Sequence, residues 1–133
     1  MPLEVRTRID VRWRDLDMLG HLNQSVYHEL LEEGRAALFQ QLDALEAFVL
    51  ARVELDYRLE VRRDHGPVEI VVRITRVGRS SVTVEHDVVR DDGEVAATGS
   101  SVLVAWDPEA RRSRPLGDAE RARLTDALGA TPA

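Results

Sequence analysis

The segment from Asp15 to Asn23 holds the side chains of this chain that are best suited to chemistry. It brings two carboxylates, an imidazole and an amide together within nine residues. A carboxylate is ionised at neutral pH and can act as a nucleophile or a base without a further activating group. The structural alternative is a turn and a helix cap, which Asp and Asn commonly form. A divalent cation on Asp15 and Asp17 is a second alternative, although the neighbouring sequence supplies few further oxygen ligands.

Composition excludes several other chemistries. The 133 residues include no cysteine, so disulfides, zinc–thiolate sites, iron–sulfur clusters and catalytic thiols are ruled out. All 18 basic residues are arginine, which also removes Schiff-base chemistry on lysine.

A net charge of -6 argues against nucleic acid as a partner. No apolar run approaches the roughly 18 residues that span a bilayer, and the first ten residues lack the apolar centre of a signal peptide. We therefore expect a cytoplasmic protein without a membrane partner.

A predicted strand and a predicted helix flank the Asp15–Asn23 segment. Apolar and charged residues alternate over residues 3–13, which predicts a half-buried strand. Apolar residues recur every three or four positions over about residues 24–44, which predicts an amphipathic helix capped by Asn23 or Ser25. The N–H groups and positive dipole end at its start can stabilise a carbonyl oxygen that gains negative charge. Gly34 lies on the apolar stripe, which predicts a close approach to a sheet.

The remaining sequence predicts four further strands. Alternation with a period of two covers residues 53–61, 68–74, 82–88 and 95–106, with turn residues between them. One helix on an antiparallel sheet is an α+β arrangement, here in a single domain over residues 1–133. Beyond about residue 108 we expect a less ordered tail with a short helix over 118–128. Both faces of the 95–106 strand are rich in apolar or small residues, so we expect the helix to cover one and a second copy the other.

Residues 11–27, which read Val-Arg-Trp-Arg-Asp-Leu-Asp-Met-Leu-Gly-His-Leu-Asn-Gln-Ser-Val-Tyr, resemble the opening motif of hotdog-fold thioesterases of the 4-hydroxybenzoyl-CoA thioesterase type. Glu32-Glu33-Gly34-Arg35 matches the next element of that pattern, and the likeness extends over roughly residues 3–106. It implies one long helix wrapped by a curved five-stranded antiparallel sheet, and hydrolysis of an acyl-CoA or acyl-carrier thioester without cofactor or metal. The 4-hydroxybenzoyl type has aromatic residues where this chain has Leu22, Asn23 and Gln24, so the chain is more similar to general acyl-CoA thioesterases.

The same resemblance implies a role for each matching residue. Asp17 corresponds to the catalytic aspartate, as nucleophile or general base, and Asp15 to a structural acid that holds the loop. The turn whose backbone amides would polarise the thioester carbonyl comprises Gly20, His21, Leu22, Asn23 and Gln24. The substrate pocket would combine Tyr27 with a partner chain's Leu59, Val61 and Val68. Arginine is suited to bidentate phosphate contact, so Arg76, Arg79, Arg111 and Arg112 could meet CoA phosphates, with solvated arginines at strand ends as the alternative. Ser80 and Ser81 are further possible CoA contacts.

Two other functions stay open at this point. The chain could be a non-catalytic hotdog protein that binds an acyl ligand or assists assembly. It could also be a hotdog dehydratase, which is disfavoured because the Asp/His pair of those enzymes lies in a different local pattern. In each case we expect a homodimer or a dimer of dimers. His86, on the apolar face of its strand, is expected to be a buried core or interface histidine rather than a catalytic one.

Overall fold

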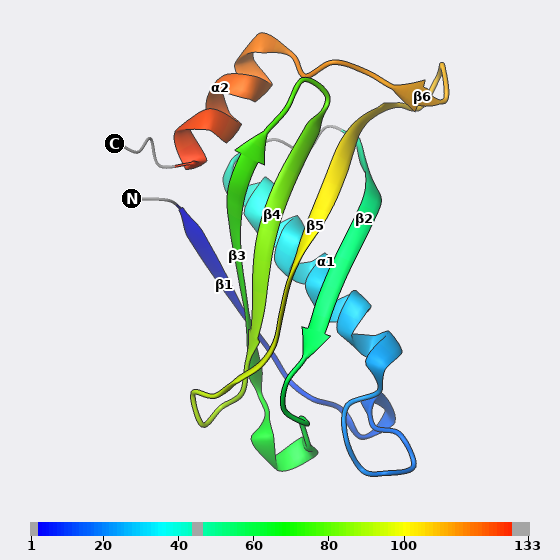
Figure 1. The fold of residues 1–133 in the computed structure, drawn as a ribbon, viewed down its shortest axis with the longest axis vertical. Helices are drawn as coiled ribbons and strands as arrows, with labels where there is room; N and C mark the ends of the chain where they lie inside the picture. The colour runs from blue at the N-terminus through cyan, green and yellow to red at the C-terminus, as the bar shows by residue number, and fades with distance from the viewer. Residues whose placement is uncertain (1–2, 44–46, 129–133) are drawn as a thin grey trace.

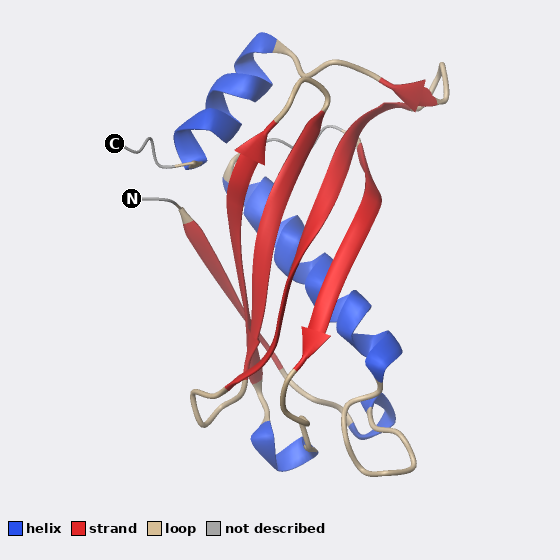
Figure 2. Cartoon of the chain, in the orientation of Figure 1, coloured by secondary structure: helices blue, strands red, loops and turns tan. Residues whose placement is uncertain are grey.

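An antiparallel sheet curls around one long helix in the computed structural model, which describes residues 3–43 and 47–128. Figure 1 shows the helix lying behind the sheet, and Figure 2 shows the same arrangement by element type. The strands and helices are β1 (Glu4–Ile9), α1 (Gln24–Gln41), β2 (Phe48–Tyr57), β3 (Val68–Val77), β4 (Ser81–Val89), β5 (Val95–Asp107), β6 (Arg112–Ser113) and α2 (Asp118–Ala127). Two short 3-10 helices, η1 (Trp13–Asp15) and η2 (Arg63–His65), complete the order.

The strand order is β1-β3-β4-β5-β2, with the two-residue β6 paired to β5. This is the α+β hotdog arrangement that the resemblance implies, and it confirms the expected fold. Two strands, β1 and β2, differ most from expectation. β1 ends at Ile9, and β2 runs over 48–57 instead of 53–61. The chain leaves the β2 ladder because the N–H groups of Arg58 and Leu59 both donate to the carbonyl of Ala96.

Helix α1 packs its apolar stripe directly against the inner face of β3. Leu31 and Leu38 are fully buried there, and Ile70 of β3 has no exposed surface either. A Cβ added to Gly34 would lie 2.6 Å from Ile70 Cγ2 and 3.0 Å from Val72 Cγ2. The predicted close approach of the helix to the sheet is therefore confirmed. Position 44, the expected helix end, lies outside the described residues.

The outer face of the sheet is charged at β3 and β4. Arg73 of β3 pairs with Glu85 and Asp87 of β4 at 2.9 and 3.3 Å on this face. On β5 the alternate positions include Val102, Val104 and Trp106, which are partly buried, so the second apolar face expected for the 95–106 strand is present along part of that strand. The large apolar side chains with the most exposed surface lie on the edge strand β2, in the segment after it, in the loop before α1 and at the start of β5: Val49, Leu50, Tyr57, Leu59, Trp13, Met18, Leu19 and Val95.

The segment after residue 108 is ordered through residue 128, in contrast to the less ordered tail expected from its composition. The expected helix over 118–128 is present as α2. Leu124 of α2 is fully buried, and Leu116 just before the helix is nearly so. The Leu116 N–H donates to the carbonyl of Arg79 at 3.0 Å, which fixes the segment to the β3–β4 hairpin. Within the described residues, neither helix combines the length and apolarity needed to cross a membrane.

Candidate active site

Asp15 is a buried carboxylate that holds the loop before α1 in place. It is 2% exposed, and its carboxylate accepts hydrogen bonds from Arg12. The Arg12 backbone N–H donates to Oδ2 at 2.8 Å, and the guanidinium Nη2 donates to Oδ1 at 2.8 Å. Its carbonyl accepts the N–H of Asn23 at 2.9 Å, which ties the two ends of the loop together. Burial acts to raise the pKa of the Asp15 carboxyl, but the hydrogen bonds from Arg12 outweigh burial and leave that pKa below its usual value.

Asp17 lies in the same loop but faces an open cavity, with 29% of its side chain exposed. One carboxylate oxygen, Oδ1, accepts the N–H of Leu19 at 2.9 Å and that of His21 at 3.4 Å. The other, Oδ2, lies 3.0 Å from His21 Nδ1. A turn in which the Gly20 N–H donates to the Asp17 carbonyl at 3.0 Å, with Gly20 at a φ of +80°, brings His21 back to the carboxylate. The arrangement is a fixed carboxylate–imidazole pair at the edge of a cavity.

The start of α1 leaves one backbone donor for a ligand. Asn23 is the N-cap, and its side chain accepts the N–H of Ser25 at 3.0 Å, as the sequence predicts. The N–H groups of Gly20, His21, Leu22 and Asn23 already donate to the Asp17 carbonyl, the Asp17 carboxylate, the Val61 carbonyl and the Asp15 carbonyl. Among the described residues nothing accepts the N–H of Gln24, the first residue of the helix. Of the five amides expected to polarise a carbonyl, that of Gln24 is the one still available.

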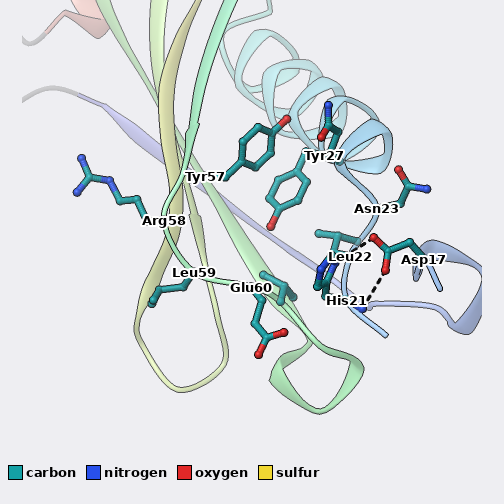
Figure 3. Close-up of a pocket in the computed structure, with 11 residues that line it drawn as sticks. Asp17, His21, Leu22, Asn23, Tyr27, Tyr57, Arg58, Leu59 and Glu60 are labelled. Carbon is teal, nitrogen blue, oxygen red and sulfur yellow. Dashed lines mark hydrogen bonds and ion pairs between the residues drawn. The ribbon is translucent and has the colours of Figure 1, made fainter. Parts of the chain in front are cut away.

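A pocket of about 480 Å³ lies between this loop, the first turn of α1 and the segment that follows β2 (Figure 3). The N–H of Leu22 donates to the carbonyl of Val61 at 2.6 Å, and His21 bridges to Arg62, so the two segments are held side by side. Eight of the residues predicted for the site line the pocket: Asp17, His21, Leu22, Asn23, Gln24, Tyr27, Leu59 and Val61.

Several predicted site residues lie in places that differ from the prediction. Leu59 and Val61 were expected from a partner chain, whereas the Leu22–Val61 hydrogen bond places them beside Asp17 of their own chain. Val68 is fully buried in the core and does not line the pocket. Gly20 lines a separate groove on the outer side of the loop, beside Trp13 and Met18.

The residues predicted to meet CoA lie at the far end of the sheet. Arg76, Arg79, Ser80 and Ser81 belong to the β3–β4 hairpin, whereas the two segments that line the pocket, the loop before α1 and the segment after β2, lie at the opposite end of the sheet (Figure 1). One protomer therefore does not bring these residues to its own Asp17. In the part of the chain that the structure describes, no cluster of three or more His, Cys, Asp or Glu side chains is arranged to hold a metal ion.

Three residues that line the pocket, Tyr57, Arg58 and Glu60, were not identified from the sequence. Tyr57 packs edge-to-face on Tyr27, with ring centroids 5.0 Å apart and an interplanar angle of 84°. The sequence could have identified Tyr57, because it lies on the same face of the predicted 53–61 strand as Leu59, which was assigned to the pocket. Glu60 and Arg58 fall on the other face of that predicted strand, but the chain leaves the ladder at residue 58 and alternation no longer applies.

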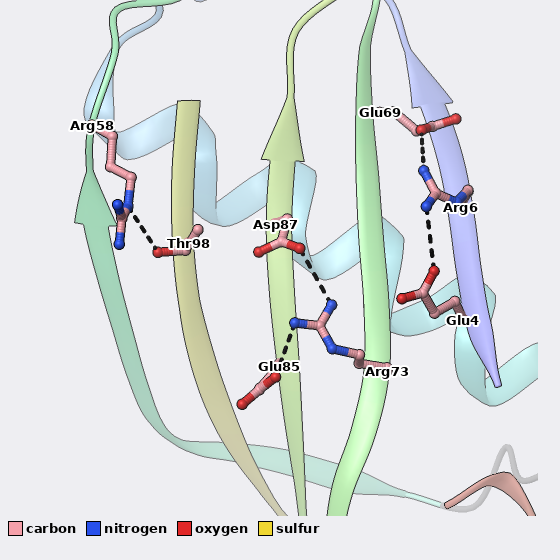
Figure 4. Close-up of polar contacts among 8 residues, drawn as sticks. All are labelled: Glu4, Arg6, Arg58, Glu69, Arg73, Glu85, Asp87 and Thr98. Carbon is pink, nitrogen blue, oxygen red and sulfur yellow. Dashed lines mark hydrogen bonds and ion pairs between the residues drawn. The ribbon is translucent and has the colours of Figure 1, made fainter. Parts of the chain in front are cut away.

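Arg58 and the tyrosines differ in how they face the pocket. The Arg58 guanidinium turns to the outer face of the sheet, where it donates to Thr98 Oγ1 at 3.3 Å (Figure 4). Tyr27 is 3% exposed and points into the pocket toward His21 in Figure 3. Burial, with a smaller contribution from Tyr57, raises the pKa of Tyr27 to about 12. The Tyr27 hydroxyl is therefore a neutral group near physiological pH.

Comparison with known proteins gives consistent matches. The family model described as "Thioesterase-like superfamily" matches residues 11–125. A thioesterase of Thermus thermophilus, solved in complex with coenzyme A and Zn, is 41% identical, with 95% of each chain covered and a TM-score of 0.85. A protein of Bacillus stearothermophilus described as a predicted thioesterase is 27% identical over 95% of this chain and 97% of its own, with a TM-score of 0.82. The uncharacterized protein YsmA of Bacillus subtilis (strain 168) is 28% identical over 122 residues, which are 88% of this chain and 82% of YsmA.

Proposed function

Because this chain belongs to the thioesterase-like superfamily, we propose that it hydrolyses the thioester of an acyl-CoA and that Asp17 delivers the attack on the thioester carbonyl. The observation that carries the proposal is the position of Asp17 and the start of α1 on one pocket wall. Both Asp17 and Gln24, whose N–H is unused within the described residues, line this cavity. The Thermus thermophilus relative solved with coenzyme A supports CoA as the thiol part of the substrate.

The chemistry needs a nucleophile and a stabilised oxyanion. As the carbonyl carbon is attacked, its oxygen gains negative charge, which the Gln24 N–H and the positive end of the α1 dipole would stabilise. The C–S bond then breaks, and the thiolate leaves and takes up a proton. The acyl group ends as a free carboxylic acid, with water supplying the second oxygen.

Two roles for Asp17 fit its contacts. As a nucleophile, its carboxylate would form a mixed anhydride with the acyl group, which water then hydrolyses. As part of a general base, it would hold His21 with Nδ1–H toward Oδ2, so that Nε2 is the nitrogen that can accept a proton from water. Rapid quenching of a single turnover and mass measurement of the chain separates these roles, since only the nucleophile adds the acyl mass to Asp17.

We also propose that the hairpin residues of a second copy complete the CoA site. Arg76 and Arg79 lie at the end of the sheet away from the pocket of their own chain, so they could meet the same CoA only from a partner. Guanidinium groups are well suited to the phosphates of CoA because they form paired hydrogen bonds with phosphate oxygens.

Thiol release from a panel of acyl-CoA substrates tests the proposal. The wild-type chain should hydrolyse at least one member, and Asp17→Asn should lower kcat by about a hundredfold or more, since a positioned catalytic group contributes at least this much. A non-catalytic acyl-binding protein would release no thiol from any substrate.

Two neighbouring carboxylates serve as matched controls. Glu60→Gln changes the other carboxylate of the pocket wall and should retain most of kcat. Asp15→Asn should lower the melting temperature more than kcat, because Asp15 is buried and paired with Arg12. Equal activity of Asp17→Asn and wild type, or a larger loss of kcat in Glu60→Gln, would remove Asp17 from its proposed role.

A further inference from the structure

The pocket ends at the Tyr27–Tyr57 pair. Of the residues that line it, those contributed by β2 and the following segment begin at Tyr57, and those from α1 end at Tyr27. Neither Leu55, two residues back along β2, nor Leu30 and Leu31, one turn further along α1, reaches the cavity. At this level the two rings pack edge-to-face, one from the helix and one from the edge strand.

The inner face of the sheet continues behind these tyrosines in a known order. Tyr57 lies opposite Ala97 of β5, Leu55 lies opposite Gly99, and the next inward position of β2 lies opposite Ser101. Each step of two residues advances along the strand by about 6.6 Å. The Ser101 level is therefore roughly 13 Å beyond the Tyr57 ring level, on the same face of the sheet.

A polar cluster occupies that deeper level. The guanidinium of Arg35, which is 6% exposed, donates to Ser101 Oγ at 3.2 Å, and His86 Nε2 lies 2.9 Å from the same oxygen. Within the described residues Arg35 forms no ion pair with a carboxylate, and burial lowers the pKa of Arg35. A hydrocarbon tail that reached this cluster would displace or desolvate a buried cation, which is unfavourable.

We infer that Tyr57, backed by Tyr27, sets an upper limit on acyl length and that the chain acts on short acyl groups. The inference rests on the proposed thioesterase function, because it takes the carbonyl to lie at Asp17 and the acyl tail to point toward the tyrosines. A short acyl group fits between Asp17 and the ring pair. A longer chain meets the Tyr57 ring and, behind it, Leu55 and the Arg35 cluster.

Acyl-CoA substrates of increasing length, from acetyl through butyryl and hexanoyl to octanoyl and decanoyl, test this inference. The wild type should show a steep fall in kcat/KM beyond the length that reaches Tyr57. Tyr57→Ala should raise the ratio of octanoyl to butyryl kcat/KM by about tenfold or more, since even one methylene group changes this ratio by at least that much in an apolar pocket. Tyr57 is 47% exposed, so its truncation should leave the fold intact.

Three further variants separate a steric limit from a general disturbance. Tyr57→Phe keeps the ring and should keep the wild-type ratio. Leu55→Ala alone should also keep it, because the chain is stopped before it reaches Leu55. The double variant Tyr57→Ala/Leu55→Ala should extend the range further, from octanoyl to decanoyl. An effect of Leu55→Ala that is seen only when Tyr57 is also replaced is expected only if the acyl tail runs along β2 past Tyr57.

Binding to the Asp17→Asn chain gives a readout that does not depend on catalysis. Calorimetric titration with butyryl-CoA and octanoyl-CoA should show tighter binding of the butyryl compound, and a reversal of this preference when Tyr57→Ala is added. Hydrolysis of octanoyl-CoA and butyryl-CoA with equal efficiency by the wild type, or an unchanged ratio in Tyr57→Ala, overturns the length limit and leaves the thioesterase function standing. Absence of all hydrolysis, with the binding preference retained, overturns the function and leaves the length limit standing.

Discussion

Asp15 and Asp17 lie two residues apart and have opposite surroundings. Asp15 is enclosed and saturated with hydrogen bonds from Arg12, whereas Asp17 is part-exposed beside a cavity and pairs with His21. Both have acidic side chains, so residue type alone does not separate them. The backbone turn at Gly20, which brings His21 to Asp17, makes one acid a structural residue and the other a candidate for chemistry.

His86 is the residue whose protonation most clearly affects stability. It has no exposed surface, its Nε2 is hydrogen-bonded to Ser101, and its Nδ1 has no partner among the described residues. Burial, with the nearby Arg35 charge as a second cause, lowers the pKa of His86 from 6.5 to about 4. Between these two values the unfolded chain binds a proton that the folded chain does not, so the free energy of unfolding falls as the pH falls.

We predict that lowering the pH from 7 to 5 costs the wild type about 2 kcal/mol of unfolding free energy through His86 alone. Urea denaturation at both pH values, at one protein concentration, measures the total change. His86→Gln keeps a hydrogen-bonding group beside Ser101 but cannot titrate, so it should lose about 2 kcal/mol less over the same interval. The same loss in both chains would show that His86 titrates alike in the folded and unfolded states.

At the scale of elements, the contact between α1 and β3 fixes where the helix start lies. Gly34 is a position of close approach, and the β-branched side chain of Ile70 leaves little freedom to move away. The helix that carries Tyr27 and Gln24 at its first turns is thereby held at a set height over the sheet. Glycine at this position lowers helix propensity, and the close packing compensates for that cost.

We predict that Gly34→Ala destabilises the chain by about 1–3 kcal/mol, although alanine is the better helix former, because its Cβ would overpack against Ile70. Chemical denaturation measures the change. Glu33→Ala, on the exposed side of the same helix, should stay within about 0.5 kcal/mol of wild type. When combined with Ile70→Ala, the Gly34→Ala change should cost less than it does alone, since the clashing methyl is removed. A stabilised Gly34→Ala chain would contradict the close contact.

At the scale of the whole molecule, the edge strand β2 is the surface that suits a second copy. It has a neighbour on one side only, and apolar side chains including Val49, Leu50 and Tyr57 are exposed along it or at its end. Clustered apolar surface of this kind marks interaction sites in most proteins. A two-fold dimer would also give the hairpin residues of one chain a pocket to reach in the other.

Subunit complementation tests the shared site. Asp17→Asn and Arg76→Ala/Arg79→Ala should each lose most activity toward acyl-CoA. After subunit exchange, mixed dimers should contain one intact site, so an equal mixture should regain roughly a quarter of the wild-type activity. Light scattering should first show a dimer at micromolar concentration. A stable monomer, or a mixture that stays as inactive as its parents once exchange has been verified, would mean that each site is built within one chain.

The sequence by itself determined the elements and the segment that we propose carries the chemistry, because both depend on local order along the chain. Alternation and helical periodicity located the five long strands and α1, and the spacing from Asp15 to Asn23 located the loop before the helix. Tertiary structure alone decided which groups meet in the pocket. The point where β2 leaves its ladder brings Glu60 and Val61 beside the loop, and the Gly20 turn pairs Asp17 with His21. The burial of Leu124 made the C-terminal segment part of the core. These outcomes depend on strand register and on hydrogen bonds between distant segments, which periodicity does not encode.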